Sequence, residues 1–426
     1  MPKFSEIICP VCNKNVAWED ALIWVPTRDE NNNLLREPNS KSIMGKYKPQ
    51  GLIESETGSA DGESIAVELA VGRPLRCPRR NNFLGEEIEP HDLPDGIYDR
   101  PSTIVGLLGP ADSGKSTLLG LMANHACGTK PRPLRNAGLS FQIESRARLF
   151  DKNYGPLTRN QAVVPTPPGV QAPWVTLEVI SDGNGENNMI LCDSAGENFD
   201  GRINSDGYGQ AAAVDMPFLF SADVLMICVP PSHLELAPPA IDDNDNDDHY
   251  EDLANGLKEL LIKSQRALRR SAVGRIRALP WVCIVITKAD SIGVDGIEPL
   301  PELSLDYRTT KRNVSYLDLK SEAHRIMDES DRIRSWIREH DIHVFDLVED
   351  NSMDNPHRVD GKPVPQLPLF RGFSYHLITA RSGGSNENNM FEAGAYHERI
   401  LDTVVMTAAL IDADSKWSDS WVEGAQ

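Results

Sequence analysis

The stretch GPADSGKST at positions 109–117 combines glycines, a lysine and hydroxyl groups at a spacing that can hold a phosphate. Glycines let the backbone curl so that successive N–H groups point at one anion. The lysine would reach the β- and γ-phosphates of a nucleotide, and the serine after it would ligate Mg²⁺. The spacing predicts a phosphate-binding loop made by Gly109, Asp112, Ser113, Gly114, Lys115, Ser116 and Thr117.

The residues on either side of this loop support that interpretation. The apolar, β-branched run STIVGLL at 102–108 is typical of a buried strand, and TLLGLMANHA after the loop has helical spacing. The alternative is a chance strand, turn and helix whose Lys115 is merely solvated. Because strand and helix stand on the correct sides of the loop, the sequence favours the phosphate site.

A second motif places a carboxylate at a strand end. The run MILC in NNMILCDSAGENF (187–199) leads to Asp193, and Gly196 follows three residues later. In phosphate-loop nucleotidases such an aspartate holds Mg²⁺, and the glycine N–H contacts the γ-phosphate. The run WVTLEVISD (174–182) precedes it across the turn-rich GNGEN, which predicts an antiparallel hairpin.

Two further strand ends predict which base is bound. The run WVCIVITKAD (281–290) ends in a carboxylate, Asp290, which can accept from N1–H and the N2 amino group of guanine, a donor pair that adenine lacks. This disfavours an ATPase. The Lys288 stem can lie over the purine ring. The run FSYHLITARSGG (373–384) can offer loop N–H groups to guanine O6. The predicted base-binding residues are Thr287, Lys288, Asp290, Thr379, Ala380 and Arg381.

The motifs GPADSGKST, DSAG, TKAD and TAR follow one another in this order, each at the end of an expected strand. They resemble the Ras-like GTPases of the translation-factor-related (TRAFAC) class, over roughly residues 100–415. More narrowly, the pair ICPVC and the switch DSAGE look like the bacterial double-GTPase proteins of conflict or signalling operons. The resemblance implies a switch that hydrolyses GTP to GDP with Mg²⁺, and we expect a protein partner or a homodimer.

One residue departs from the family pattern. Where Ras-like proteins often carry a glutamine that orients the attacking water, this chain has Glu197. A carboxylate beside γ-phosphate oxygens is electrostatically unfavourable unless it is protonated or turned away. Slow or partner-activated hydrolysis is therefore expected. The alternative is a pseudo-GTPase, a scaffold that holds GTP or GDP without significant turnover.

The stretch between Lys115 and Asp193 is long, so the first switch region looks enlarged. Its Mg²⁺-ligating threonine is predicted to be Thr166 in AVVPTPPG, because this residue lies just before the 174–182 strand, and Thr158 is the alternative. An arginine of this segment could stabilise γ-phosphate charge, although a solvated arginine is the more common case. The candidates are Arg146, Arg148 and Arg159.

The order of elements predicts a doubly wound α/β phosphate-loop GTPase domain of the Ras-like type, in which nucleotides bind at the carboxyl ends of the strands. The expected strands are at about 102–108, 174–182, 187–193, 222–229, 281–287 and 374–380, and the helices at about 115–126, 251–270, 318–340 and 396–411. The predicted domain covers 100–415, with insertions near 131–170, 231–250 and 351–369 and a tail at 416–426.

Residues 1–99 predict a small module of zinc-ribbon type, with an irregular region between Cys12 and Cys77, where the chain is rich in Asn, Pro, Gly and Ser. Cys9 and Cys12 have the spacing with which two thiolates grip one tetrahedral ion. No second cysteine pair follows, so Cys77 and His91 are the best candidates for the third and fourth Zn²⁺ ligands. The alternative, that this segment binds no metal and Cys77 is incidental, stays open.

Composition sets limits on the rest. The chain has 426 residues, 40% of them hydrophobic, which is ordinary for a globular protein. A formal charge of −20 opposes non-specific binding to nucleic acid or anionic lipid. No apolar run is long enough for a membrane helix, and the start lacks the apolar stretch of a signal peptide, so a cytoplasmic location is expected. Cys192, Cys228 and Cys283 lie in apolar runs and are interpreted as small buried hydrophobic residues.

Overall fold

The structure is a computed structural model. It describes residues 4–26, 47–51, 75–81, 85, 87–88, 91–94, 96–110, 113–127, 134, 137–143, 154–157, 161, 175–181, 185–193, 221–237, 280–292, 318–349, 358–359, 362–363, 370–379 and 398–411. The helix expected at 251–270, the tail at 416–426 and most of the three expected insertions lie outside the described residues.

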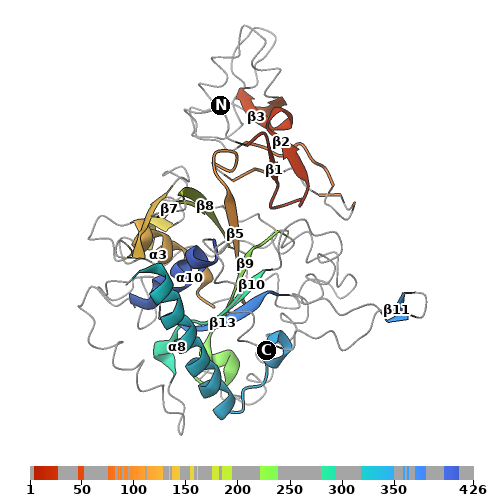
Figure 1. Cartoon of the computed structure of the whole chain (residues 1–426). Helices are drawn as coiled ribbons and strands as arrows, with labels where there is room; N and C mark the ends of the chain where they lie inside the picture. Colours follow the sequence, from red (N-terminus) through yellow and green to blue (C-terminus); the bar gives the residue numbers. More distant parts are fainter. Residues whose placement is uncertain are drawn as a thin grey trace.

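A seven-stranded sheet forms the centre of the molecule (Figure 1), in the order β13-β10-β9-β5-β8-β7-β6. Neighbours from β13 to β8 run parallel, whereas β7 is antiparallel to β8 and β6 is antiparallel to β7. This mixed sheet with parallel strands fits a phosphate-loop GTPase fold. The strands are β5 (Ser102–Leu108), β6 (Leu139–Ile143), β7 (Val175–Ser181), β8 (Gly185–Cys192), β9 (Val224–Val229), β10 (Trp281–Ile286) and β13 (Gly372–Leu377).

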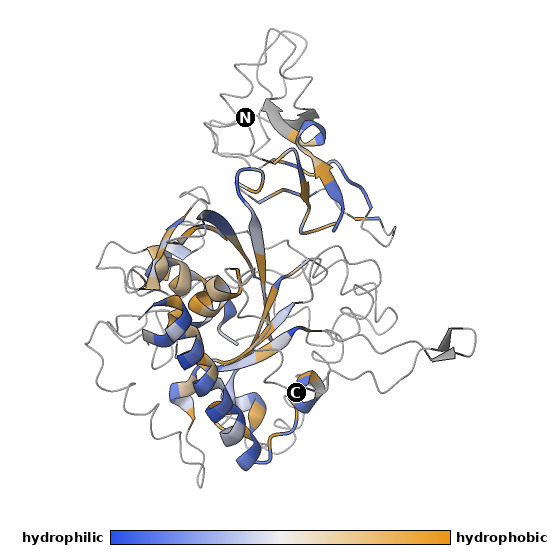
Figure 2. Ribbon diagram, in the orientation of Figure 1, coloured by the Kyte–Doolittle hydropathy of each residue, from blue (hydrophilic) through white to orange (hydrophobic). Residues whose placement is uncertain are grey.

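Side chains of the central strands alternate between two apolar clusters because successive residues of a strand point to opposite faces. In β9, Val224, Met226 and Cys228 join one cluster, and the residues between them join the other. Both faces are buried, which explains why these strands are continuous apolar runs rather than alternating ones. Figure 2 shows orange, apolar segments along the central strands.

Helices α3 (Lys115–Cys127) and α10 (Asp402–Ile411) pack on the face of Val224 and Met226. Helix α8 (Leu319–Glu339) contributes its first half to this cluster and Ile333, Trp336 and Ile337 to the other. Its amino end is capped by Asp318, whose carboxylate accepts from the Ser321 N–H at 3.0 Å. Helices therefore contribute to both clusters, as a doubly wound arrangement requires.

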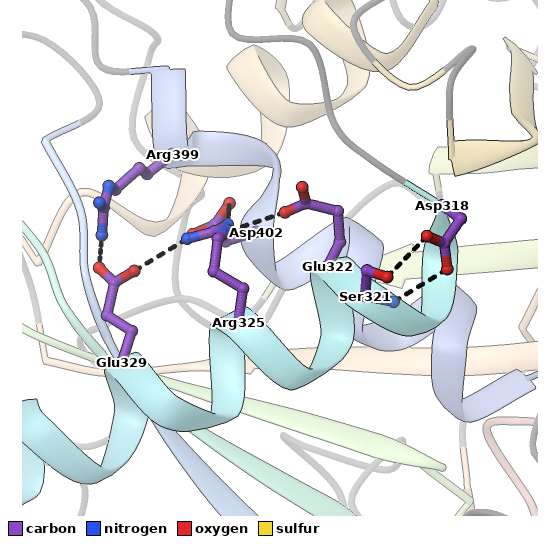
Figure 3. Close-up of polar contacts among 7 residues, drawn as sticks. All are labelled: Asp318, Ser321, Glu322, Arg325, Glu329, Arg399 and Asp402. Carbon is purple, nitrogen blue, oxygen red and sulfur yellow. Dashed lines mark hydrogen bonds and ion pairs between the residues drawn. The ribbon is translucent and has the colours of Figure 1, made fainter.

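Arg325 joins α8 to α10 (Figure 3). Its guanidinium donates to Glu322 at 2.7 Å, to Glu329 at 2.9 Å and to Asp402 of α10 at 3.1 Å. Glu329 also pairs with Arg399, which lies just before α10. The carboxylates are nearly buried, so a charge network rather than apolar contact joins the helices at this position.

The amino-terminal part lies beyond the amino end of β5 (Figure 1). It contains β1 (Glu6–Ile8) paired antiparallel with β2 (Asn15–Ala17), the turn η1 (Trp18–Asp20), and β3 (Leu22–Pro26) paired antiparallel with β4 (Tyr47–Gly51). Isolated bridges join Leu22 to Arg76 and Arg76 to Asp92, so Arg76 and Asp92 lie beside the start of β3. Strands β3 and β4 lie within the stretch between Cys12 and Cys77 that was expected to be irregular, so this expectation was wrong for these two strands. No helix among the described residues is both long and apolar enough to cross a membrane.

The remaining elements are short and connect or follow the main strands and helices along the chain. They are η5 (Pro231–Leu234), η6 (Ala289–Ser291), α9 (Asp346–Glu349), β11 (Arg358–Val359), β12 (Lys362–Pro363) and η7 (Glu398–Leu401). Within the expected helix at 396–411, the described part begins as the 3₁₀ turn η7 and becomes α-helical from Asp402.

Candidate functional site

The phosphate loop follows the carboxyl end of β5, and its backbone requires glycine at two positions. Gly109 has φ +152°, and a Cβ there would lie 2.3 Å from the Cys228 carbonyl oxygen of the neighbouring strand β9. Gly114 has φ +78°, a conformation that side-chain-bearing residues rarely adopt. The two glycines thus allow the sharp curl between β5 and α3.

Lys115 is the first residue of α3 and is only 5% exposed. Its ammonium group donates to the carbonyl oxygens of Gly109 at 2.8 Å and Pro110 at 2.7 Å, and to Ser113 Oγ at 3.2 Å. These bonds hold a buried positive charge against the inside of the loop at the amino end of a helix. A cation and a helix amino end together favour an anion there.

Ser116 and Asp193 meet beside the loop. The serine hydroxyl of α3 donates to the Asp193 carboxylate, which directly follows β8 and is 3% exposed. These residues are distant in sequence and adjacent because β5 and β8 are parallel neighbours. A hydroxyl and a carboxylate are oxygen ligands that suit Mg²⁺, so the donor set fits the ion.

The TKAD motif is tied to the phosphate loop. Thr287 follows β10, and its hydroxyl donates to the Ser113 carbonyl oxygen at 2.7 Å. Lys288 has φ +49°, which turns the chain so that Lys288 and Asp290 are exposed while the intervening alanine is buried. Side chains that would contact a purine therefore lie on the accessible side of this turn.

Thr379, at the end of the last strand, supports the TKAD turn. Its hydroxyl accepts from the Asp290 backbone N–H at 3.1 Å, and the Ile378 carbonyl accepts from the Ala289 N–H at 3.3 Å. Sequence reasoning assigned the two threonines to nucleotide contact and missed these bonds. Their position after a buried strand end is the signal that could have suggested a supporting role.

These hydrogen bonds bring together the loop residues, Asp193, Thr287, Asp290 and Thr379 at the carboxyl ends of the sheet strands. Thr117 is half-buried on α3. Other predicted residues lie outside the described part of the chain: Asp112, Thr158, Thr166, Gly196, Glu197, Ala380, Arg381 and the arginines at 146, 148 and 159.

A helical turn at 154–157 packs on α3 and was not anticipated from the sequence. Tyr154 and Leu157 are buried against Gly120, where a Cβ would lie 2.5 Å from Leu157 Cδ1. Burial, with a smaller contribution from the charge of Asp193, raises the pKa of the Tyr154 hydroxyl above its usual range. This part of the enlarged segment is thus anchored near the candidate Mg²⁺ residues.

The three cysteines inside sheet strands are buried, as predicted. Cys192 is 3% exposed, and Cys228 and Cys283 are 0% exposed. Burial raises the pKa of both Cys228 and Cys283 to about 12, so these thiols stay protonated at neutral pH. They act as small apolar residues, and the sheet offers no thiolate at these three positions.

A second cluster gathers the four residues predicted as zinc ligands. The ligand atoms of Cys9, Cys12, Cys77 and His91 all lie within 4.8 Å of one another, and the four residues are buried. Cys9 Sγ lies 3.2 Å from His91 Nε2, and Cys12 Sγ lies 3.9 Å from Cys77 Sγ. Burial raises the pKa of the Cys9 thiol, whereas hydrogen bonds with the Cys77 and Cys9 thiols lower that of Cys12.

Backbone geometry places these side chains. Between β1 and β2 the Asn13 N–H donates to the Cys9 carbonyl at 2.9 Å, and the Cys9 N–H donates to the Lys14 carbonyl at 3.0 Å. Asn13 has φ +52°, which completes the tight turn around the first cysteine pair. The Cys77 N–H donates to the His91 carbonyl at 3.0 Å, which pairs the other two residues.

Comparison with known proteins gives no family. No protein-family model and no curated protein matches this sequence. Among solved structures, a GTP-binding protein from Sulfolobus solfataricus in complex with GDP is 11% identical, with a TM-score of 0.27, and the likeness covers 73% of this chain and 53% of that one. The Ski7 GTPase-like domain of S. cerevisiae, bound to GDP and inorganic phosphate, is 14% identical, with a TM-score of 0.28, covering 74% and 51%.

The signal recognition particle receptor SRb-GTP/SRX complex from Chaetomium thermophilum is 12% identical with a TM-score of 0.29, covering 73% of this chain and 98% of that one. The chain spans about half the length of the archaeal and yeast proteins. At TM-scores this low, these likenesses carry no argument, and the fold and site rest on the contacts described above.

Proposed function

We propose that the chain binds a guanine nucleotide with Mg²⁺ at the carboxyl edge of its sheet and hydrolyses GTP to GDP. The observation that carries this proposal is the set of hydrogen bonds joining the phosphate loop to Asp193 and to the TKAD turn. A phosphate loop alone binds many nucleotides. A phosphate loop bonded to an exposed aspartate turn, itself supported by Thr379, suits a phosphorylated guanine nucleoside.

Each residue has a chemical task in this proposal. Lys115 and the loop N–H groups bind and orient the phosphates, and Asp290 accepts from the two guanine donors. Ser116 and Asp193 would hold Mg²⁺, and the bound ion would supply positive charge to neutralise the phosphates. Thr166 as a further Mg²⁺ ligand, and Glu197 beside the attacking water, remain sequence-based parts of the proposal.

The biological setting is supported only by the motifs. A switch role with a protein partner or homodimer, the double-GTPase resemblance and the cytoplasmic location stay predictions. The same holds for the division into residues 1–99, 100–415 and 416–426.

Nucleotide titrations of purified variants test the proposal. Lys115→Ala should abolish tight GTP binding, because it removes the buried cation of the loop. The matched control Lys320→Ala removes an exposed lysine of α8 and should bind like the parent. Ser116→Ala and Asp193→Ala should lose most of the gain in GTP affinity that Mg²⁺ gives over EDTA. Parental affinity in all three site variants, with circular dichroism showing them folded, would place the site elsewhere.

Single-turnover hydrolysis of bound GTP separates an enzyme from a pseudo-GTPase. We expect GDP and phosphate to form at a rate that Asp193→Ala reduces. Tight binding without turnover, alone or as a concentrated homodimer, would establish the scaffold instead. The nucleotide released on denaturing freshly purified protein should be GDP or GTP.

A further inference from the structure

The amino-terminal cluster takes no part in the proposed nucleotide chemistry. We propose that Cys9, Cys12, Cys77 and His91 bind one zinc ion in a closed structural site, and that this ion fixes the segments around 4–18 and 75–94 at the amino edge of the sheet. The ion serves folding of this part and not hydrolysis.

The donor set selects the class of metal. Three thiols and one imidazole suit zinc, whereas Mg²⁺ and Ca²⁺ prefer oxygen ligands. Four protein ligands complete a tetrahedral shell, as in structural zinc sites, whereas catalytic zinc sites keep one position for water or substrate. All four residues are buried, so the cluster offers substrate no surface to approach.

The distances between donor atoms agree with a shared ion. With Zn–S bonds of about 2.3 Å and tetrahedral angles, two sulfurs lie about 3.8 Å apart and a sulfur and nitrogen about 3.6 Å. The observed separations are 3.9 Å for Cys12 and Cys77 and 3.2 Å for Cys9 and His91. A disulfide would need the sulfurs at about 2.05 Å, so the Cys12–Cys77 separation fits co-ligands better than a bond.

The site joins two parts of the chain that also share backbone hydrogen bonds between Leu22 and Arg76, a bond from Arg79 to the Asn15 carbonyl at 2.9 Å, and one apolar cluster. Cys9 and Cys12 come from the turn between β1 and β2, and the other two ligands lie beside Arg76 and Asp92, which isolated bridges join to each other and to Leu22 at the start of β3. A part of the chain this small has a limited apolar core, and a metal commonly supplies further stability.

Three hydrogen bonds attach this turn and the strands beside it to residues that precede the sheet strands. The Pro10 carbonyl between the two cysteines accepts from the Ser221 hydroxyl at 2.6 Å, and Ser221 lies just before β9. Tyr98, which leads into β5, donates from its hydroxyl to the Val16 carbonyl at 3.3 Å, and its own carbonyl accepts from the Phe4 N–H at 2.9 Å. The metal therefore holds a turn that rests on the amino ends of β5 and β9.

The nucleotide residues lie at the opposite ends of the same strands. Strand β5 has seven residues, and at about 3.3 Å per residue it separates the two edges by about 23 Å. Metal loss should thus loosen the amino-terminal part and leave GTP binding largely intact.

Metal analysis of full-length protein purified without chelator tests the site. We expect one zinc per chain, and less than a tenth of that in Cys9→Ser/Cys12→Ser and in His91→Ala. His91→Cys retains a four-ligand set and should keep the zinc, which a merely packed histidine would not explain. Cys127→Ser, changing a half-exposed thiol outside the cluster, is the matched control and should keep the full metal content.

Cobalt substitution and limited proteolysis test the zinc site in the parent protein, without any variant. Parent protein loaded with Co²⁺ should show the visible absorption of tetrahedral cobalt–thiolate coordination. Zinc removal by a strong chelator should speed proteolysis within residues 1–99 at least tenfold, and zinc should reverse this, while GTP affinity changes less than threefold. Absence of metal and of the cobalt spectrum, or a Cys12–Cys77 disulfide under reducing purification, would overturn the proposal. Loss of GTP binding on zinc removal would contradict the proposal that the zinc site and the nucleotide site are independent of each other.

Discussion

Asp290 decides the preference for guanine in the proposed site. It is exposed on the turn that Thr379 supports through the Asp290 backbone rather than its side chain, so replacing the carboxylate leaves that bond in place. The predicted pairing with N1–H and the amino group needs two acceptors, which only the carboxylate supplies.

Asp290→Asn should therefore weaken GTP binding on the order of 10²-fold, the loss of about two hydrogen bonds to a charged acceptor. Xanthine nucleotide should gain affinity, because its C2 oxygen can accept from the new amide. Competition titrations with GTP, ATP and xanthosine triphosphate measure both effects. Asp328→Asn, an exposed aspartate of α8, serves as control, and equal affinity of the parent for ATP and GTP would contradict the assignment.

Glu197 is expected to affect the rate of GTP hydrolysis rather than the affinity for GTP. If its carboxylate stands where an amide usually orients water, Glu197→Gln should hydrolyse GTP at least as fast as the parent, because the neutral group both donates and accepts. Single-turnover rates from about pH 5.5 to about pH 8.5 provide the measurement. A fall of 10²-fold or more in the variant, with a parental rate that rises through one ionisation, would instead make Glu197 a general base.

At the scale of elements, the sequence predicted the strands that carry chemistry well because their signals are local. Buried runs such as WVCIVI become β10 with little shift in bounds, and the expected antiparallel pair forms as β7 and β8, with β8 beginning at Gly185 within GNGEN. A supporting role could have been suspected for Thr287 and Thr379, but their partners, Ser113 and Asp290, could not be predicted, because they depend on which strands become neighbours.

Strand β6 shows the limit of the same reasoning. It lies inside the stretch interpreted as an insertion, yet it extends the sheet beyond β7. Its sequence LSFQI does alternate, with Leu139 and Phe141 buried, but five residues give a weak signal beside long apolar runs. The turn at 154–157 gave no periodic signal, since its burial depends on a glycine on α3.

Replacing Gly120 with alanine should have two opposing effects on the stability of the protein. In an open helix position Gly120→Ala would stabilise by about 1 kcal/mol. Here the added methyl would lie 2.5 Å from Leu157 Cδ1 and 2.7 Å from Tyr154 Cδ1, and overpacking of this kind costs about 1–3 kcal/mol. We expect net destabilisation and a lower Tm by calorimetry. Adding Leu157→Ala should make the two changes non-additive, because it removes the nearest clashing atom, and strict additivity would argue against the contact.

At the scale of the whole molecule, mild acid should have two opposite effects on the stability of the fold, one from the net charge and one from buried titratable groups. The formal charge is −20 at pH 7 and the isoelectric point is near 4.9, so lowering the pH towards 5 relieves repulsion and should by itself stabilise the fold. Buried titratable groups act against this. The carboxylate of Glu349 is desolvated, yet hydrogen bonds from Arg334 and Tyr375 lower its pKa, so its contribution to stability is lost as the pH falls.

His376 allows the effect of a buried titratable group to be measured separately from the effect of overall charge. It is 4% exposed on β13 and bonded to Ser374 Oγ at 2.9 Å, and its pKa is affected by the charges of Asp402 and Arg325, two residues that Figure 3 shows in one network. Its pKa is lowered from 6.5 to about 4, mainly by burial; the charge of Asp402 opposes this shift and the charge of Arg325 adds to it. The unfolded chain therefore binds this proton more readily than the folded one, so stability is full above about pH 6.5 and falls as the pH drops towards 4.

The loss between pH 7 and pH 5 should be about 2 kcal/mol, by linkage from these two pKa values. His376→Gln keeps a hydrogen-bonding group without the titration, so urea unfolding at the two pH values should show that loss in the parent and not in the variant. His324→Gln, an exposed histidine of α8, should behave like the parent. If parent and His376→Gln change stability in parallel, the acid response belongs to the carboxylates and the overall charge, and His376 is not buried as described.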